Sequence, residues 1–246
     1  MPFLFLSPST QEYNPYVTGQ SEEYWMNQLA DRITPYLETS GINVTRNDPN
    51  GTVGASIRTS NSGNYDFHLA LHSNAAPASV SGQIRGIDIY YYTPSQDGRR
   101  MAELLAENLR TIYPLPSRVR VLATNSIVEL RRTRAPAAFI ELGYHDNLED
   151  AQWIINNLDT IARSISKAVT EYFGLPLLSP RPVRSGTVSL QSGSLNLRDG
   201  PSVSSPVILR IPNGAVVSVL NSYNGWYVIR YNGIIGWAFG EYIRLS

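Results

Sequence analysis

Residues 65–75 read Tyr-Asp-Phe-His-Leu-Ala-Leu-His-Ser-Asn-Ala, and this stretch decides how the chain is organised. It follows a loop-like Asn-Ser-Gly-Asn run, and its short apolar core is typical of a buried strand. A strand buried on both faces rarely contains imidazole side chains, yet this one contains two. His72 lies at the carboxyl end, where open α/β sheets bind their ligands, so we predict a functional role for it.

His68 lies four residues before His72, which is roughly 13 Å along an extended strand. Two imidazoles at that separation do not bind one metal ion in a regular strand. We therefore predict that His68 is structural, a histidine whose hydrogen bonds are satisfied within the core.

Strands and helices alternate on both sides of this stretch. Apolar, β-branched runs predict further strands at residues 3–6, 42–46, 86–92, 119–122, 128–130 and 137–142. Helical spacing of apolar residues predicts helices starting after Ser21 and over residues 55–60, 100–109 and 147–172. Pro35 should kink the first helix and Gly41 should end it. The alternation predicts an α/β fold, with a mostly parallel sheet flanked by helices.

The sequence changes character after residue 174. Gly, Pro, Ser and Arg dominate residues 175–187, which we interpret as a linker between residues 1–174 and a second domain at 188–246. Short strands separated by Asn224-Gly225 and Asn232-Gly233 predict hairpins there, and so a small β-barrel. This tail contains no histidine and no cluster of acids. It is typical of an accessory binding domain.

Composition excludes several kinds of site. The 246 residues have a formal net charge of zero, which gives no electrostatic argument for binding nucleic acid. The chain has no cysteine, so thiol nucleophiles, disulfides and thiolate zinc sites are excluded. No apolar run is long enough to span a membrane, and the apolar start at residues 1–6 is too short for a signal peptide.

Three ionisable residues lie where chemistry at the end of the sheet requires them: Glu23 in the first helix, His72 at one strand end and Glu141 at another. A catalytic zinc takes three protein ligands and keeps one position open for water. A nearby carboxylate that is not a ligand then accepts the proton from that water. Glu23 and His72 as ligands, with Glu141 as the base, fit this division of roles.

The order of these motifs resembles the zinc-dependent N-acetylmuramoyl-L-alanine amidases of type 3. The resemblance covers roughly residues 3–174. It is based on Glu23, residues 66–75, Gly86–Tyr91, Glu129–Arg132 and Pro136–Asn147. It implies that His72 and Glu23 bind Zn²⁺, that Glu141 is the catalytic carboxylate, and that Asn74 and Arg131 contact substrate. The tail resembles a bacterial SH3-like domain that binds cell walls.

One departure leaves the third zinc ligand open. Members of the family usually place a histidine in the turn after the first strand, whereas residues 7–12 here read Ser-Pro-Ser-Thr-Gln-Glu. The amide oxygen of Gln11, which we favour, the carboxylate of Glu12 and the imidazole of His145 are the candidates. An amide is a poorer zinc ligand than an imidazole, so weaker retention of the metal is expected if Gln11 takes this position.

The resemblance implies a peptidoglycan hydrolase that cleaves the amide between N-acetylmuramic acid and L-alanine, either an endolysin or an autolysin. Two alternatives remain: a metal-poor amidase that only binds the wall, and a zinc peptidase of the stem peptide. The expected partner is bacterial peptidoglycan, without nucleic acid. Because no signal peptide is recognised, we expect release by lysis or through a holin.

Overall fold

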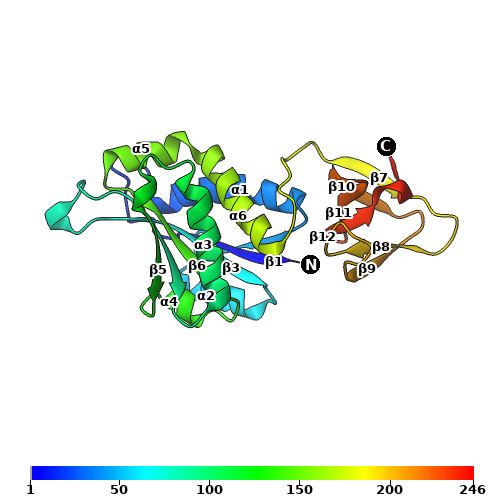
Figure 1. Ribbon diagram of the computed structural model, residues 1–246, viewed down its shortest axis with the longest axis horizontal. Coiled ribbons are helices and arrows are strands. Elements are labelled where there is room, and N and C mark those ends of the chain that lie inside the picture. Colours follow the sequence, from blue (N-terminus) through cyan, green and yellow to red (C-terminus); the bar gives the residue numbers. More distant parts are fainter. Residues whose placement is uncertain (1) are drawn as a thin grey trace.

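The computed structural model describes residues 2–246; Met1, where the predicted catalytic domain begins, lies outside them. The chain forms two units that lie side by side (Figure 1). The larger contains a six-stranded sheet in the order β2-β1-β3-β6-β4-β5. Its strands are β1 (Phe3–Pro8), β2 (Asn43–Arg46), β3 (Phe67–Asn74), β4 (Ile87–Tyr92), β5 (Val119–Thr124) and β6 (Ala137–Tyr144).

The sheet confirms the predicted mostly parallel α/β fold. β2, β1, β3 and β6 are parallel to one another, and β4 is parallel to β5. The β4–β6 pair is antiparallel, so two strands at one edge run against the other four. The carboxyl ends of β1, β3 and β6 therefore meet at the same edge of the sheet.

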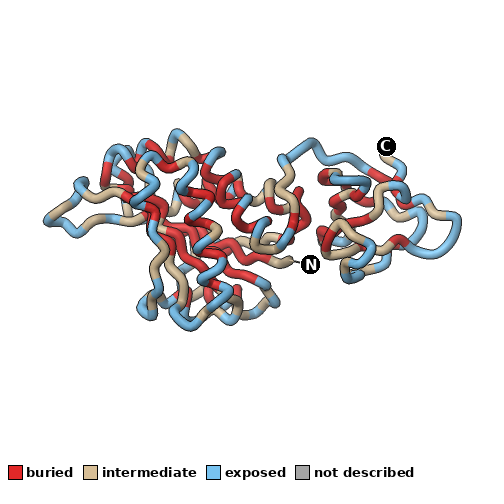
Figure 2. The backbone as a smooth tube through the Cα atoms, in the orientation of Figure 1, coloured by how far each residue is buried: buried red, intermediate tan, exposed pale blue. Residues whose placement is uncertain are grey.

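Two sets of helices cover the two faces of this sheet (Figure 1). One face packs against α1 (Glu22–Thr39), α3 (Gln96–Arg110), α5 (Leu148–Asn156) and α6 (Leu158–Phe173), whose apolar side chains form the main core. The other face is covered by the short helices α2 (Val53–Ser62) and α4 (Val128–Arg132). In Figure 2 the strands form the buried centre of this unit. Among residues 2–246, no helix combines the length and the apolar character that a membrane crossing requires.

Several predicted elements differ in detail. Residues 128–130, predicted as a strand, instead form α4, which begins after Ile127 and brings Glu129 and Leu130 to the sheet. The predicted helix 147–172 is two helices, because Asn157 has φ −124° and ψ 18° and interrupts the hydrogen-bond ladder. Ser21 caps α1 as predicted, with its side chain accepting a hydrogen bond from Tyr24 N, and the helix continues through Pro35 to Thr39.

The smaller unit is an antiparallel sheet in the order β13-β7-β10-β11-β12-β8-β9. Its strands are β7 (Arg184–Val188), β8 (Ser194–Arg198), β9 (Val207–Pro212), β10 (Val216–Tyr223), β11 (Trp226–Tyr231), β12 (Ile234–Phe239) and β13 (Ile243–Leu245). Asn224 and Asn232 have positive φ before glycines, as two-residue hairpin turns require. β7 begins at Arg184, so the predicted linker 175–187 contains most of the first strand of this sheet.

The two units share a packed junction, whereas the sequence suggested independent modules joined by a linker. The Trp237 indole is completely buried against Gly41, where φ is +91° and a Cβ would collide with the ring. Asn43 forms two hydrogen bonds with the backbone of Ile235: its Nδ2 donates to Ile235 O at 3.0 Å and its Oδ1 accepts from Ile235 N at 2.9 Å. Arg230 also pairs with Glu38 at 2.8 Å. The second unit is therefore docked on the carboxyl end of α1 and the start of β2.

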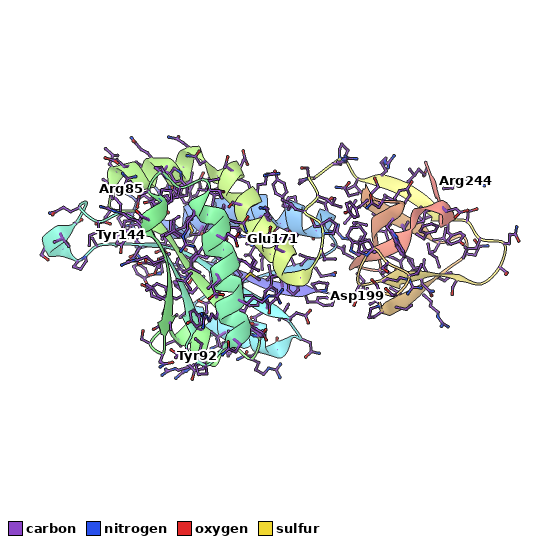
Figure 3. The ribbon with its side chains drawn as sticks, viewed as in Figure 1. Arg85, Tyr92, Tyr144, Glu171, Asp199 and Arg244 are labelled. Carbon is purple, nitrogen blue, oxygen red and sulfur yellow. The ribbon has the colours of Figure 1, made fainter. Side chains whose placement is uncertain are left out.

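This junction lies away from the edge that His72 occupies. Figure 3 shows Asp199 at the junction, with Tyr144, the last residue of β6, toward the other end of the larger unit. The carboxyl ends of β3 and β6 therefore face away from the second unit.

Candidate functional site

The pairing of β3 with β6 places His72 opposite Glu141 at the carboxyl edge of the sheet. His72 on β3 pairs with Glu141 on β6, and Glu141 in turn pairs with Asp88 on β4. The His72 ring stacks on Phe139 with centroids 4.3 Å apart. Phe139 belongs to the small apolar cluster under α4, whereas the alternate strand residues Leu71 and Ile140 belong to the main core. His72 and its neighbours thus occupy the sheet face that only short helices cover.

The first helix contributes Glu22 to this site. Glu22 Oε1 lies 2.8 Å from His72 Nδ1 and accepts a hydrogen bond from Ser73 N at 3.3 Å. Burial disfavours the ionised form of Glu22, but hydrogen bonding and the charge of His72 outweigh burial, so the pKa of Glu22 is lowered. Burial likewise opposes the charged form of His72. Glu22, Glu129 and Glu141 outweigh it and raise the pKa of His72.

The structure places Glu22, and not the predicted Glu23, against His72. Glu23 is half-buried one residue along, where its Oε1 accepts a hydrogen bond from Asn27 Nδ2 at 3.0 Å. The sequence contains the signal that distinguishes the two residues. Glu22 continues the buried stripe of α1 that includes Met26 and Leu29, at spacings of four and seven residues. An acidic residue on the buried stripe of a helix needs a partner, so the stripe favours Glu22 over Glu23 as the residue of the site.

Gln11 lies beside the same imidazole nitrogen. Its Nε2 is 3.2 Å from His72 Nδ1, and its Oε1 accepts a hydrogen bond from Asn14 Nδ2 at 2.9 Å. Asn14 Nδ2 also donates to Glu22 Oε2 at 2.9 Å. The turn after β1 and the start of α1 therefore converge on His72 Nδ1 through Gln11 and Glu22.

Glu141 is a buried carboxyl group of the site with a strongly raised pKa. Burial raises its pKa to about 8; the charge of His72 opposes this shift, while those of Glu22 and Asp88 add to it. Its Oε2 is buried and has no hydrogen-bond partner among residues 2–246. Glu141 is therefore poised to hold or release a proton near neutral pH, as a general acid or base must.

Glu129 is a second residue that the sequence analysis did not assign to the site. Its Oε2 lies 3.9 Å from His72 Nε2, on the opposite side of the ring from Glu22. Its Oε1 lies 2.8 Å from His68 Nε2 and accepts a hydrogen bond from Ser7 Oγ at 2.6 Å. His68 is fully buried and also contacts Ser60 Oγ at 3.0 Å. These contacts account for His68 as a satisfied core histidine.

A cavity of about 580 Å³ opens beside this side of His72. It is lined by the turn after β1, the start of α2 and the start of α4, including Gln11, Glu12, His72 and Glu129. The cavity therefore reaches His72 between α2 and α4.

The remaining candidates lie elsewhere around the site. His145 is buried, with Nδ1 3.0 Å from Ser73 Oγ and 3.1 Å from Ser73 O, and it stacks on Tyr16. Asn74 ends β3 and uses its Oδ1 to accept from Ala75 N. Arg131 is exposed on α4. Glu23, which was predicted to be a ligand, pairs with Asn27 instead, and the substrate roles of Asn74 and Arg131 stay predictions.

Comparison with known proteins fits this arrangement. Residues 10–171, about two thirds of the chain, match the family model described as N-acetylmuramoyl-L-alanine amidase. The chain belongs to this amidase family. Residues 193–244 match the model of the bacterial SH3 domain, which agrees with the antiparallel second sheet.

Solved amidase structures share the fold of the larger unit. An N-acetylmuramoyl-L-alanine amidase of Nostoc punctiforme is 16% identical and superposes with a TM-score of 0.63, covering 70% of this chain and 97% of its own. One from Clostridium difficile 630 is 20% identical with a TM-score of 0.62, covering 70% and 97%. At these identities the likeness shows the fold alone.

Among curated proteins, YrvJ of Bacillus subtilis, named for the same amidase activity, is 37% identical over 59 residues. The match covers 24% of this chain and 11% of that relative, so it describes a short segment of a longer protein.

Proposed function

We propose that this protein hydrolyses the amide bond between the lactyl group of N-acetylmuramic acid and L-alanine in bacterial peptidoglycan. The observation that carries the proposal is the convergence of Glu22 and Gln11 on His72 Nδ1, beside the perturbed carboxyl group of Glu141 on the neighbouring strand. Family membership supports the same activity.

Glu141 supplies the proton transfers. Its carboxylate accepts a proton from the attacking water as the water oxygen bonds to the amide carbon. It then donates that proton to the leaving nitrogen as the carbon–nitrogen bond breaks. The products are a free lactyl carboxylate and the amino terminus of L-alanine. A pKa raised to about 8 favours the donating role, and positive charge near Glu141 favours the accepting role.

The residues around His72 Nδ1 fit a divalent cation. Glu22 offers this nitrogen an acceptor and Gln11 offers it a donor, but an imidazole nitrogen either donates or accepts. In the amide orientation seen here, one of the two contacts is therefore unsatisfied. Turning the Gln11 amide, which exchanges its present contact with Asn14 Nδ2, would satisfy both and would offer a cation at Nδ1 an amide oxygen beside the Glu22 carboxylate.

We therefore propose Glu22, His72 and Gln11 as the zinc ligands, with Glu22 taking the role first predicted for Glu23. Bound zinc would polarise the amide carbonyl and make water more acidic. Residues 2–246 contain no group of three His, Cys, Asp or Glu side chains that could hold a metal. The site thus relies on one amide ligand, and metal retention should be weak.

The second unit is the proposed wall-binding part. Its match to the bacterial SH3 domain supports this role, and a pocket lined by Trp226, Phe239 and Tyr242 offers aromatic surface for a wall component. Asn74 and Arg131 are proposed to contact the substrate near the carboxyl edge of the large sheet.

Mass spectrometry of purified walls after digestion tests the activity. The proposal expects new L-alanine amino termini and intact glycan strands, and no products with His72→Ala. New reducing sugar ends, or cuts within the stem peptide, would instead assign the site to another hydrolase. Wall binding without any product would identify a protein that only binds the wall.

A further inference from the structure

The pair formed by Glu129 and His68 is a buried polar unit that the proposed reaction does not use. Glu129 is 3% exposed and His68 is fully buried. Burying two ionisable side chains is costly unless each is well paired, and here each has at least two polar neighbours. One of these neighbours is His72, which suggests a role beyond the core.

The two nitrogens of His72 face different carboxylates. Nδ1 has Glu22 at 2.8 Å and the Gln11 amide at 3.2 Å, whereas Nε2 has Glu129 at 3.9 Å. The two ring nitrogens point away from each other, so Glu22 and Glu129 cannot both bind a metal that His72 holds through one nitrogen. Nδ1 has two prospective co-ligands, and it is therefore the metal-binding nitrogen.

This leaves Nε2 facing Glu129 Oε2 at 3.9 Å, which is close enough for an ion pair and too long for a direct hydrogen bond. When a histidine binds a metal through one ring nitrogen, a carboxylate beside the other nitrogen keeps the proton there. It also fixes the ring orientation and makes the metal-binding nitrogen more basic. Glu129 is itself fixed by His68 and Ser7 on its other oxygen, so its Oε2 remains directed to His72. Stacking on Phe139 restricts the ring further.

We propose that Glu129 is a positioning residue, which acts through His72 to strengthen a metal site with a single imidazole ligand. His68 has the supporting role of holding the Glu129 carboxylate in place. This inference rests on the proposed zinc site, but it concerns side chains that do not contact the metal.

The test compares Glu129→Gln with Ser60→Ala in the full chain. Ser60 contacts the far nitrogen of His68 and not Glu129, so its variant perturbs the same buried unit without removing the carboxylate. Zinc dissociation constants come from competition with a chromophoric chelator. Glu129→Gln should weaken zinc binding by about 10–100-fold, the usual effect of losing such a partner. Ser60→Ala should change it by less than about threefold.

A second readout reports on the ring itself. With only three histidines, imidazole ¹⁵N labelling resolves each side chain of the zinc-loaded protein. Wild type should show His72 protonated at Nε2, and Glu129→Gln should shift the Nε2 signal. Ser60→Ala should preserve it. If Glu129→Gln does not fold, Glu129→Asp keeps the charge for His68 but withdraws the carboxylate from His72, and the same readouts apply.

Three outcomes overturn the inference. Unchanged zinc affinity and an unchanged His72 signal, with lowered thermal stability, would make Glu129 only the core partner of His68. Complete loss of zinc binding in Glu129→Gln would make it a ligand. If the wild-type protein binds no zinc, the proposed zinc site is itself wrong. The first two outcomes instead leave the zinc site in place and reject only the role of Glu129.

Discussion

Glu22 Oε1 lies 2.8 Å from His72 Nδ1, so the first residue of α1 and the carboxyl end of β3 are joined at one point. Glu23, the next residue, turns toward Asn27 on the same helix. Adjacent residues of a helix point in different directions, so only one of the two glutamates lies in the site. The proposed chemistry depends on this pairing more than on any other contact.

Glu141→Gln should retain the fold and the metal but reduce turnover about 10²–10⁴-fold, the usual contribution of a general acid or base. The substitution is nearly isosteric, and the Oε2 that it replaces has no partner in the described part of the chain. Zinc content and wall-lysis rates measure the two effects. Loss of zinc from this variant would make Glu141 a ligand instead.

The stability of the metal-free protein should fall as pH rises from about 5 to 9. The pKa of Glu141 is about 8 when folded and near the ordinary 4.5 when unfolded, so the folded state binds more protons between these values. Its stabilising proton is fully present below the unfolded pKa and is lost as pH passes through the folded one. Each unit of difference between the two values corresponds to about 1.4 kcal/mol.

Denaturant unfolding of wild type and Glu141→Gln across this range measures the effect. The variant does not titrate at this position, so its stability should decrease less with pH. Parallel curves for the two proteins would show that Glu141 ionises as readily in the folded state as in the unfolded one.

Gln11→Ala should weaken zinc binding about tenfold or more, and His145→Ala should leave it within about threefold. Gln11 lies 3.2 Å from His72 Nδ1, whereas His145 contacts Ser73. Chelator titration of both variants measures the two affinities. The reverse ranking would make His145 the third ligand. Equal retention by both variants would leave Glu12 as the candidate third ligand.

Trp237→Ala should destabilise the protein by about 3–5 kcal/mol, the cost of truncating a large buried aromatic side chain. Its ring fills the junction at Gly41, and the apolar core of the larger unit extends into the second unit through residues such as Val228 and Ile235. Wild type should therefore unfold in one calorimetric transition, which the variant should split into two.

Arg230→Ala provides the matched control for the junction. Its ion pair with Glu38 is partly exposed, so removing it should cost no more than about 1 kcal/mol and keep one transition. Two separate transitions in wild type would contradict a shared core and restore independent modules.

The sequence predicted the fold and part of the site. Particular residues show why it did not predict the rest. The buried runs that contain His72 and Glu141 predicted that both residues lie at strand ends of one sheet, and the structure shows that the two strands are neighbours. Glu129 was missed because Val-Glu-Leu resembles a short strand, whereas the chain forms a helix there. The contact between Trp237 and Gly41 joins residues far apart in the sequence, and no local pattern indicates it.

Zinc stoichiometry in Glu22→Ala and Glu23→Ala, measured side by side on the purified 246-residue proteins with zinc in excess, tests the central claim most directly. Wild type and Glu23→Ala should each bind about one zinc per chain, whereas Glu22→Ala should not, because Glu22 contacts His72 and Glu23 pairs with Asn27. Zinc retained by Glu22→Ala and lost from Glu23→Ala would contradict the site described here.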